Sequence, residues 1–301
     1  MQCVVIRYAI GPSLAARSAR CVWTIPLSFV SANAIVSDGI DGQAGHFRVL
    51  SEHFSAFVGL SNAELKLLGD LAEAARYHPP YRDLYVAGAS PPPARMIVAG
   101  WACQYRLLPD GHRQIISLKL PGDLIWPLMQ VRLPSSCAVA ALTELETVSA
   151  QPLIEAAAAA DPVYPGLAHA TRVMAHLHDM LLYDQIVRLG RQTACGRFAH
   201  LMLELRERLG RVGLVENDSF AMPLTQDVLA DVLGFSVVHV NRTVQQLRRD
   251  RLLDVRNGQV VLLQLEQLRE LAGWAPLPGI PVGPKSSKRG VSMERRTNNE
   301  H

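Results

Sequence analysis

One segment near the C-terminus constrains the fold more than any other part of the sequence. Thr225 is a favourable N-cap for a helix over 226–233, Gly234 ends that helix, and Ser236 caps a second helix that continues to about Asp250. Two helices of this length joined by a glycine-containing turn form a helix-turn-helix candidate. The segment therefore predicts a small helical domain of the kind that binds DNA or another protein.

The residues that follow have the pattern of a β-hairpin. Two short apolar runs, 252–256 and 259–263, are separated by Asn257-Gly258, a dipeptide that favours a two-residue hairpin turn. A hairpin in this position is typical of the wing of a winged helix-turn-helix.

The second predicted helix is basic. It carries Arg242, Arg248 and Arg249 and no acidic residue before its end, and its first turns offer His239 and Asn241. Arginine can contact guanine through two hydrogen bonds, and asparagine can do the same with adenine. A local basic face is needed for nucleic-acid binding here, because 30 lysines and arginines against 27 acidic residues leave a net charge of only +3. The alternative from these residues alone is a surface helix whose cations are solvated.

The first half of the chain changes from helical to β patterning. Residues 61–76 predict an amphipathic helix that opens with a capping box formed by Ser61 and Glu64. From Tyr77 to Ser149, short apolar runs interrupted by proline and glycine are typical of a compact β unit. Its clearest part is a hairpin that turns at Pro109-Asp110-Gly111. The residues expected on one face of its two strands are Trp101, Cys103, Tyr105, Leu107, Ile116, Leu118 and Leu120.

A long helical stretch follows the β unit. Residues 167–189 are unbroken by proline, and a further helix is expected over 191–209. Apolar residues recur in the long helix at heptad spacing, which fits either one strand of a short coiled coil between subunits or an ordinary core helix. The candidate dimer-interface residues are Leu167, Ala170, Met174, Leu177 and Leu181.

The composition excludes several classes of protein. A chain of 301 residues with 49% hydrophobic content is long enough for about two globular domains. Five cysteines without a CxxC pair indicate neither a disulfide framework nor a zinc site. Residues 21–36 have some features of an export signal, but residues 1–45 are expected to be a disordered or mis-assigned extension. No run of eighteen uninterrupted apolar residues predicts a membrane span.

The order of these parts resembles the CRP/FNR family of bacterial transcriptional regulators. The resemblance covers about residues 50–270, and its most specific portion is the helix-turn-helix segment 223–253. It implies an α+β fold: an N-terminal antiparallel, jelly-roll-like β-roll, a long dimerisation helix and a C-terminal winged helix-turn-helix. The expected divisions are an extension (1–45), a cyclic-nucleotide-binding-like sensor (46–160), a dimerisation helix (161–190), a DNA-binding domain (191–273) and a disordered basic tail (274–301).

The resemblance also implies roles for individual residues. Thr225 falls on a phosphate-contacting position, Ser236 on the N-cap of the recognition helix, and Arg242 on an arginine that reads guanine. Val237 and Val238 replace an arginine and a glutamate found in the best-known members, which predicts a half-site different from the usual one. The candidate DNA-binding residues are Thr225, Gln226, Ser236, Val237, Val238, His239, Asn241, Arg242, Arg248 and Arg249.

The sensor half departs from the cyclic-nucleotide binders of the family. Their turn continues with Gly-Glu, where this chain has Trp126-Pro127, and their phosphate-binding arginine is replaced by Ser135. Burying a cyclic phosphate without a charged partner would cost several kcal/mol. The candidate effector-pocket residues are Gly122, Asp123, Leu124, Ile125, Trp126, Ser135 and Ser136.

These observations predict a cytoplasmic, homodimeric regulator that binds a palindromic operator and senses a signal other than cyclic AMP. Double-stranded DNA, RNA polymerase and an unknown small-molecule effector are the expected partners, with no membrane. No cofactor, no metal ion and no catalytic residue is expected, because no cysteine cluster, P-loop or nucleophile elbow is present. Two alternatives stay open: a constitutive regulator with a vestigial β-roll, and a cyclic-nucleotide module with an unusual pocket.

Overall fold

The computed structural model describes residues 4–5, 24–25, 42–89, 93–125, 134–159 and 162–275. The expected extension lies almost wholly outside these residues, as do the expected tail and Trp126. Within the described ranges, no helix is both long enough and apolar enough to cross a membrane.

The N-terminal part is built from two small antiparallel sheets flanked by helices. The strand order is β3-β9-β5 in one sheet and β4-β8-β6-β7 in the other. The strands are β3 (Arg76–His78), β4 (Asp83–Tyr85), β5 (Arg95–Ala99), β6 (Ala102–Leu107), β7 (Arg113–Lys119), β8 (Ala138–Ala141) and β9 (Leu145–Ser149). The flanking helices are α2 (Gln43–Ser55), α3 (Asn62–Glu73) and α4 (Gln151–Ala159), and the short strands β1 (Val4–Val5) and β2 (Thr24–Ile25) pair with each other.

The C-terminal part joins helices to a three-stranded sheet of order β10-β12-β11. Its elements are α6 (Ala194–Gly210), β10 (Ser219–Ala221), α7 (Gln226–Leu233), α8 (Val237–Arg249), β11 (Leu253–Arg256), β12 (Gln259–Leu262) and α9 (Leu265–Ala272). The long helix α5 (Pro165–Arg191) connects the two parts. The α+β class predicted from the sequence is therefore confirmed.

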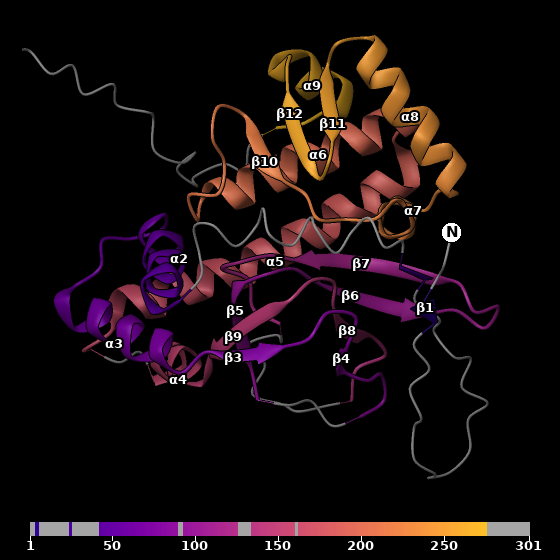
Figure 1. Cartoon of the computed structure of the whole chain (residues 1–301). Helices are drawn as coiled ribbons and strands as arrows, with labels where there is room; N and C mark the ends of the chain where they lie inside the picture. The colour runs from indigo at the N-terminus through magenta and orange to yellow at the C-terminus, as the bar shows by residue number, and fades with distance from the viewer. Residues whose placement is uncertain are drawn as a thin grey trace, which may run out of the picture.

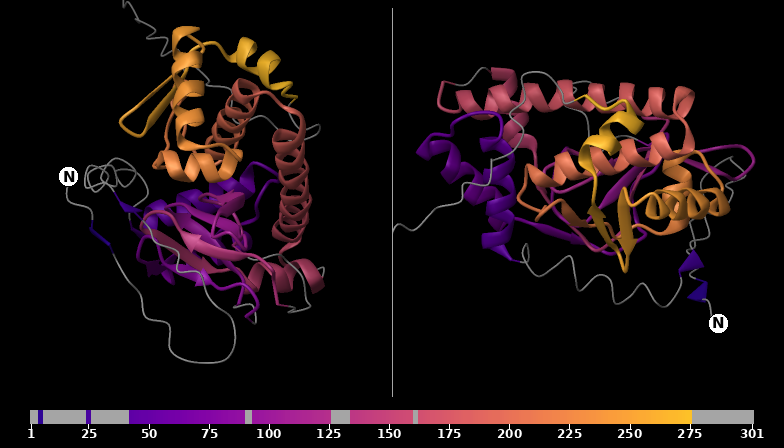
Figure 2. Two further views of the ribbon diagram at one scale, coloured as in Figure 1. Left: turned by 90° about the vertical axis from the view of Figure 1, so that its right-hand side faces the viewer. Right: turned by 90° about the horizontal axis from the view of Figure 1, so that it is seen from above.

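The views of the ribbon show how these parts are stacked. Strands β6 and β7 form the upper edge of the β-rich part, and helices α6 to α9 lie above them (Figure 1). Helix α5 runs along one side of the molecule, next to both parts (Figure 2). Helix α7 packs directly on β7, so the helix-turn-helix rests on the β-roll.

Helix α3 begins at the predicted capping box, which also has a second role. The Ser61 hydroxyl accepts a hydrogen bond from the Glu64 N–H at 3.3 Å, and Glu64 Oε2 accepts one from the Ser61 N–H at 2.8 Å. The other oxygen, Glu64 Oε1, accepts from the Leu167 N–H at 2.9 Å, at the start of α5. One buried carboxylate therefore satisfies the free N–H groups of two helices that are far apart in sequence.

The predicted hairpin is present, but a β-bulge changes which residues face the core. Gln104 pairs with Ser117, whereas Tyr105 pairs with Ile115, so the register shifts between them. Ile115 is consequently fully buried and Ile116 is only half-buried. The prediction of Ile116 on the inner face was wrong, because one extra residue in a strand moves the preceding side chains to the opposite face.

Gly100, between β5 and β6, offers the sharpest test of this packing. Its φ is +80°, and an added Cβ would lie 1.9 Å from the carbonyl oxygen of Glu144. Gly111 has a similar φ of +86° with nothing within 4 Å, so it is the matched control. We expect Gly111→Ala to lower the free energy of unfolding by about 1 to 2 kcal/mol through its positive φ alone. Gly100→Ala should lower the free energy of unfolding by about 3 kcal/mol or more, because the clash of the new Cβ with the Glu144 carbonyl is added to the strain of the positive φ. Equal losses in urea denaturation would contradict the close approach.

Candidate nucleic-acid interface

The helix-turn-helix is held by local caps at the predicted residues. The Thr225 hydroxyl accepts a hydrogen bond from the Val228 N–H at 3.2 Å, and the Ser236 hydroxyl accepts one from the His239 N–H at 3.3 Å. Between the helices, Gly234 has a left-handed conformation with φ +66°. Both helices therefore begin and end where short-range chemistry places them.

Helix α8 has one buried face and one exposed face. Val240, Thr243 and Leu247 are at most 4% exposed and pack into the domain core. Val238, with 59% of its surface exposed, and Arg242, also exposed, point away from that core. Val238 and Arg242 therefore lie on the same exposed face of α8, because side chains four residues apart are neighbours on a helix.

Two neighbouring side chains are less free than the sequence suggests. The Asn241 amide donates a hydrogen bond to Gln226 Oε1 at 2.7 Å, which links α8 to the start of α7. The His239 ring stacks on Phe235, with centroids 4.4 Å apart and planes 16° apart. Val237 is half-buried at the first turn. Contact of Asn241 with a base would require its hydrogen bond with Gln226 to be exchanged.

The two arginines at the end of α8 also differ from each other. Arg248 Nε lies 2.9 Å from the carboxylate of Asp254 in β11, and Arg256 lies 2.9 Å from the same carboxylate. Arg249 is exposed and donates to the Gln246 side chain at 2.6 Å. Sequence reasoning missed Asp254, which draws Arg248 towards the wing. Arg249 is therefore the better candidate for contact with a phosphate.

Helix α7 contacts both the β-roll and α5 through polar groups. Arg113 Nε in β7 donates to the Asp231 carboxylate at 2.8 Å, and the Gln114 amide donates to the Asp231 carbonyl at 2.7 Å. Gln185 in α5 donates to the Val232 carbonyl at 2.8 Å. Burial raises the pKa of Asp231 above its ordinary value, although Arg113 acts in the opposite direction. These polar contacts connect β7 and α5 to the helix-turn-helix.

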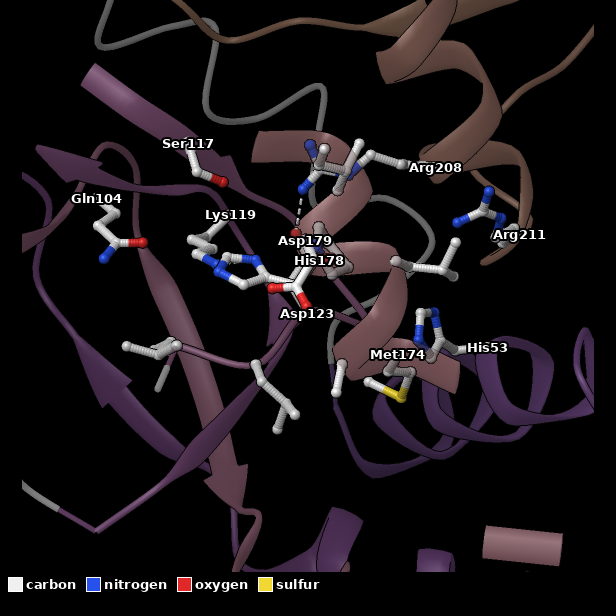
Figure 3. A pocket seen from close by; sticks show the side chains of 16 residues that line it. His53, Gln104, Ser117, Lys119, Asp123, Met174, His178, Asp179, Arg208 and Arg211 are labelled. Carbon is white, nitrogen blue, oxygen red and sulfur yellow. Dashed lines mark hydrogen bonds and ion pairs between the residues drawn. The ribbon is translucent and has the colours of Figure 1, made fainter. Parts of the chain in front are cut away.

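The candidate effector residues do not all meet at one place. Asp123, Leu124 and Ile125 line a cavity of about 480 Å³ between the β-roll, α5 and α6 (Figure 3). Ser135 instead ties neighbouring loops together: its N–H donates to the Tyr85 hydroxyl at 3.0 Å, and its hydroxyl accepts from the Cys137 N–H at 3.0 Å.

Gly122 and Ser136 have other surroundings. Gly122 lies behind the cavity wall, where an added Cβ would be 2.4 Å from the His53 ring. Ser136 is exposed. The structure therefore brings three of the candidate residues together and leaves the serines and Gly122 outside the lining.

The candidate dimer residues are mostly buried against their own chain. Leu167, Ala170 and Met174 belong to the core cluster that also contains residues of α2, α3 and α4. Leu177 is 6% exposed, and Leu181 lines the cavity. The first three residues of this heptad pattern are therefore covered by the chain's own helices, whereas Leu181 is half-buried, and their part in a dimer interface stays a prediction.

The described cysteines and histidines carry no sign of metal chemistry. Among the residues that the structure describes, no group of three or more histidine, cysteine or acidic side chains could hold an ion. Burial raises the pKa of the Cys103 thiol to about 12. A thiol with such a pKa is a poor nucleophile at neutral pH, so it acts as a small core residue.

Comparisons with known proteins agree with this geometry. Residues 196–271 match the family model of the Crp-like helix-turn-helix domain. The nitrogen fixation regulation protein FixK of Bradyrhizobium diazoefficiens is 30% identical over 175 residues, which cover 56% of this chain and 69% of that protein. The transcriptional activatory protein AadR of Rhodopseudomonas palustris is 28% identical over 183 residues, covering 58% and 72%.

A solved structure shows the same arrangement. The structure of FixK2 from Bradyrhizobium japonicum is similar with a TM-score of 0.57 and 26% sequence identity, covering 67% of this chain and 98% of that chain. The similarity therefore extends beyond the helix-turn-helix into the β-rich part.

Proposed function

Because this chain belongs to the CRP/FNR family of transcriptional regulators, we propose that it binds a palindromic operator as a homodimer and responds to a signal other than cyclic AMP. It is a DNA-binding regulator and not an enzyme. The observation that carries the proposal is the exposed start of α8. There Ser236, free backbone N–H groups and outward side chains can meet a DNA groove together.

The proposed DNA contacts fall into two classes. Thr225, Gln226 and Ser236 lie at the helix starts, where hydroxyl, amide and backbone N–H groups suit phosphate oxygens. On the exposed side of α8, Val238 offers methyl groups to thymine and Arg242 can donate two hydrogen bonds to guanine. His239, Asn241 and Val237 flank these positions and complete the readout surface, while Arg248 supports the wing and Arg249 adds a phosphate contact.

Replacing Arg242 tests this assignment. The preferred operator is first selected from random duplex DNA at about 0.1 M salt. Arg242→Ala should then weaken the binding free energy for that operator by about 1 to 3 kcal/mol and relax the preference at one base pair. Arg249→Ala is the control, because loss of a phosphate contact should weaken preferred and random sequences alike. Fluorescence anisotropy measures both. An Arg242→Ala protein that binds the preferred operator as tightly as the wild type would contradict the proposed readout.

We place the dimer interface on the exposed face of α5. Tyr183, Ile186 and Val187 are 58%, 68% and 52% exposed, although they are large apolar residues. His176, Met180, Tyr183 and Val187 follow the alternating spacing of four and three residues that is typical of paired helices, and Ile186 lies beside Val187. A two-fold dimer along this strip would bring two recognition helices to half-sites about one DNA turn apart.

We expect cyclic AMP to bind this β-roll poorly, because the position that would hold its phosphate carries no positive charge. Ser135 stands where the family's phosphate-binding arginine is expected, and its polar groups are used by Tyr85 and Cys137. No charge is therefore supplied at that position to offset the desolvation of a cyclic phosphate. The proposed site of action is the cytoplasm, where bacterial chromosomal DNA is found, and RNA polymerase is the proposed partner at the promoter.

A further inference from the structure

The cavity of about 480 Å³ lies at the junction of the two parts of the molecule. Its walls come from β6 and β7, from the turn over 121–125, from α5, and from Arg208 and Arg211 near the end of α6. Because α6 falls largely within the matched helix-turn-helix domain, a ligand in this cavity would touch both the sensor and the DNA-binding part.

One wall carries a buried ammonium group. Lys119, at the end of β7, is only 5% exposed, and its Nζ lies 3.3 Å from Nδ1 of His178 in α5. Burial lowers the pKa of Lys119 to about 8 and that of His178 to about 4. At neutral pH the lysine is thus a cation whose neighbouring imidazole is neutral, which leaves its charge uncompensated by that contact.

The nearby carboxylates are already engaged or exposed. Asp123 faces Lys119, but its carboxylate contacts Arg208 and accepts a hydrogen bond from the Leu120 N–H at 2.7 Å. Arg211 contacts Glu207. Asp179 lies at the cavity lining and is exposed. The arginines therefore have partners of opposite charge, and Lys119 supplies the charge that a ligand can balance.

A second buried polar group lines the same cavity. His53 of α2 is 7% exposed, and neither of its ring nitrogens has a hydrogen-bond partner among the described residues. Figure 3 places it next to Arg211, away from Lys119. Burial lowers its pKa to about 4, so the neutral ring offers one donor and one acceptor. Unsatisfied buried polar atoms are costly, and a ligand can satisfy them.

The remaining lining is largely apolar, with Leu124, Ile125, Met174, Leu177 and Leu181 between these polar groups. We infer that the cavity binds a small organic anion, with a single carboxylate-type head at Lys119, an apolar body against α5 and a polar atom at His53. Under the proposed function, such a ligand controls DNA binding by favouring one placement of α6 relative to the β-roll.

Two dyes that share one aromatic skeleton and differ by one sulfonate group test the inference on the full chain without DNA. Anilinonaphthalene sulfonate is the anionic probe, and uncharged N-phenylnaphthylamine is its counterpart. We expect both dyes to bind saturably. Lys119→Met should lower the affinity for the anionic dye by at least about tenfold and change the affinity for the neutral dye by less than about twofold. Lys66→Met, at an exposed lysine of α3, is the matched control and should change neither.

Filling the cavity gives a second measurement. Ala175→Trp places a large ring at the α5 wall and should weaken both dyes, provided that its circular dichroism and thermal midpoint match the wild type. Equal affinities of both dyes for wild type and Lys119→Met would overturn the inference, as would unchanged binding in a folded Ala175→Trp protein. Because no DNA is present, these results are independent of the operator measurements on Arg242.

Discussion

Glu204→Ala should lower the free energy of unfolding by about 3 to 5 kcal/mol, the cost of leaving buried cations without their partner. Glu204 in α6 is 6% exposed and contacts Arg188 of α5 and Arg208 of its own helix, the latter at 2.6 Å. Burial opposes ionisation of this carboxyl, but the two arginines hold its pKa below the ordinary value. Removal would leave Arg188, which is 2% exposed, without its carboxylate partner, and would leave Arg208, which is 6% exposed, with Asp123 as its remaining carboxylate.

A surface pair provides the control for this substitution. Glu266 contacts Arg269 at 2.5 Å, but 79% of the Glu266 side chain is exposed. We expect Glu266→Ala to change the free energy of unfolding by less than about 0.5 kcal/mol, because exposed ion pairs contribute little. Urea denaturation followed by circular dichroism measures both variants. If Glu204→Ala costs no more than Glu266→Ala, the buried cluster does not hold α5 and α6 together.

The volume-matched Glu204→Gln separates charge from packing. It keeps the shape of the side chain and can still accept a hydrogen bond, so a loss close to that of alanine would assign the effect to charge. The cluster also reaches the sensor, because Arg208 contacts Asp123 and donates to the Leu118 carbonyl at 2.8 Å. A change in Glu204 should therefore alter the cavity wall as well as the stability.

Ile186→Asp should convert the protein to a monomer and lower operator affinity by about 100-fold or more, because each half-site would then be bound alone. Ile186 is the most exposed of the apolar residues on α5, at 68%. A carboxylate there would be desolvated in the proposed dimer without a partner. Analytical ultracentrifugation measures the association state, and fluorescence anisotropy measures the affinity for the selected palindrome.

Val86→Asp is the control for this second prediction. Val86 is 59% exposed but lies in the β-roll, away from α5, so its replacement should leave both association and operator affinity unchanged. Leu177→Ala gives the contrasting result, because Leu177 is 6% exposed within the chain and its loss should destabilise the monomer fold by about 2 to 5 kcal/mol. A dimeric Ile186→Asp protein would place the interface elsewhere.

Elements that depend on short-range chemistry were the ones predicted most closely. Helix α7 spans Gln226–Leu233 as expected, because its cap at Thr225 and its stop at Gly234 act within a few residues. The capping box at Ser61 is confirmed for the same reason. Helix α2 was not predicted, because its apolar residues follow helical periodicity only weakly. Its buried face is defined by the elements that pack against it.

Helix α5 shows that periodicity alone does not predict which face of a helix is buried within its own chain. Heptad spacing indicates which residues share a face, but it does not say whether that face meets the same chain or another one. Leu167 and Met174 pack on the chain's own helices, which leaves Tyr183 and Ile186 as the free strip. The bulge between Gln104 and Tyr105 had a similar effect on the hairpin, because an alternating pattern does not reveal an inserted residue.

The sequence by itself determined the winged helix-turn-helix and which residues of α8 are exposed, because caps, turns and helical periodicity act over distances of a few residues. Only the tertiary structure decided the roles of Glu64, Lys119 and Glu204. Glu64 caps a helix 103 positions away, Lys119 meets His178 of α5, and Glu204 joins two arginines inside the molecule. Burial and charge pairing depend on which distant segments pack together, and that information lies in the folded chain.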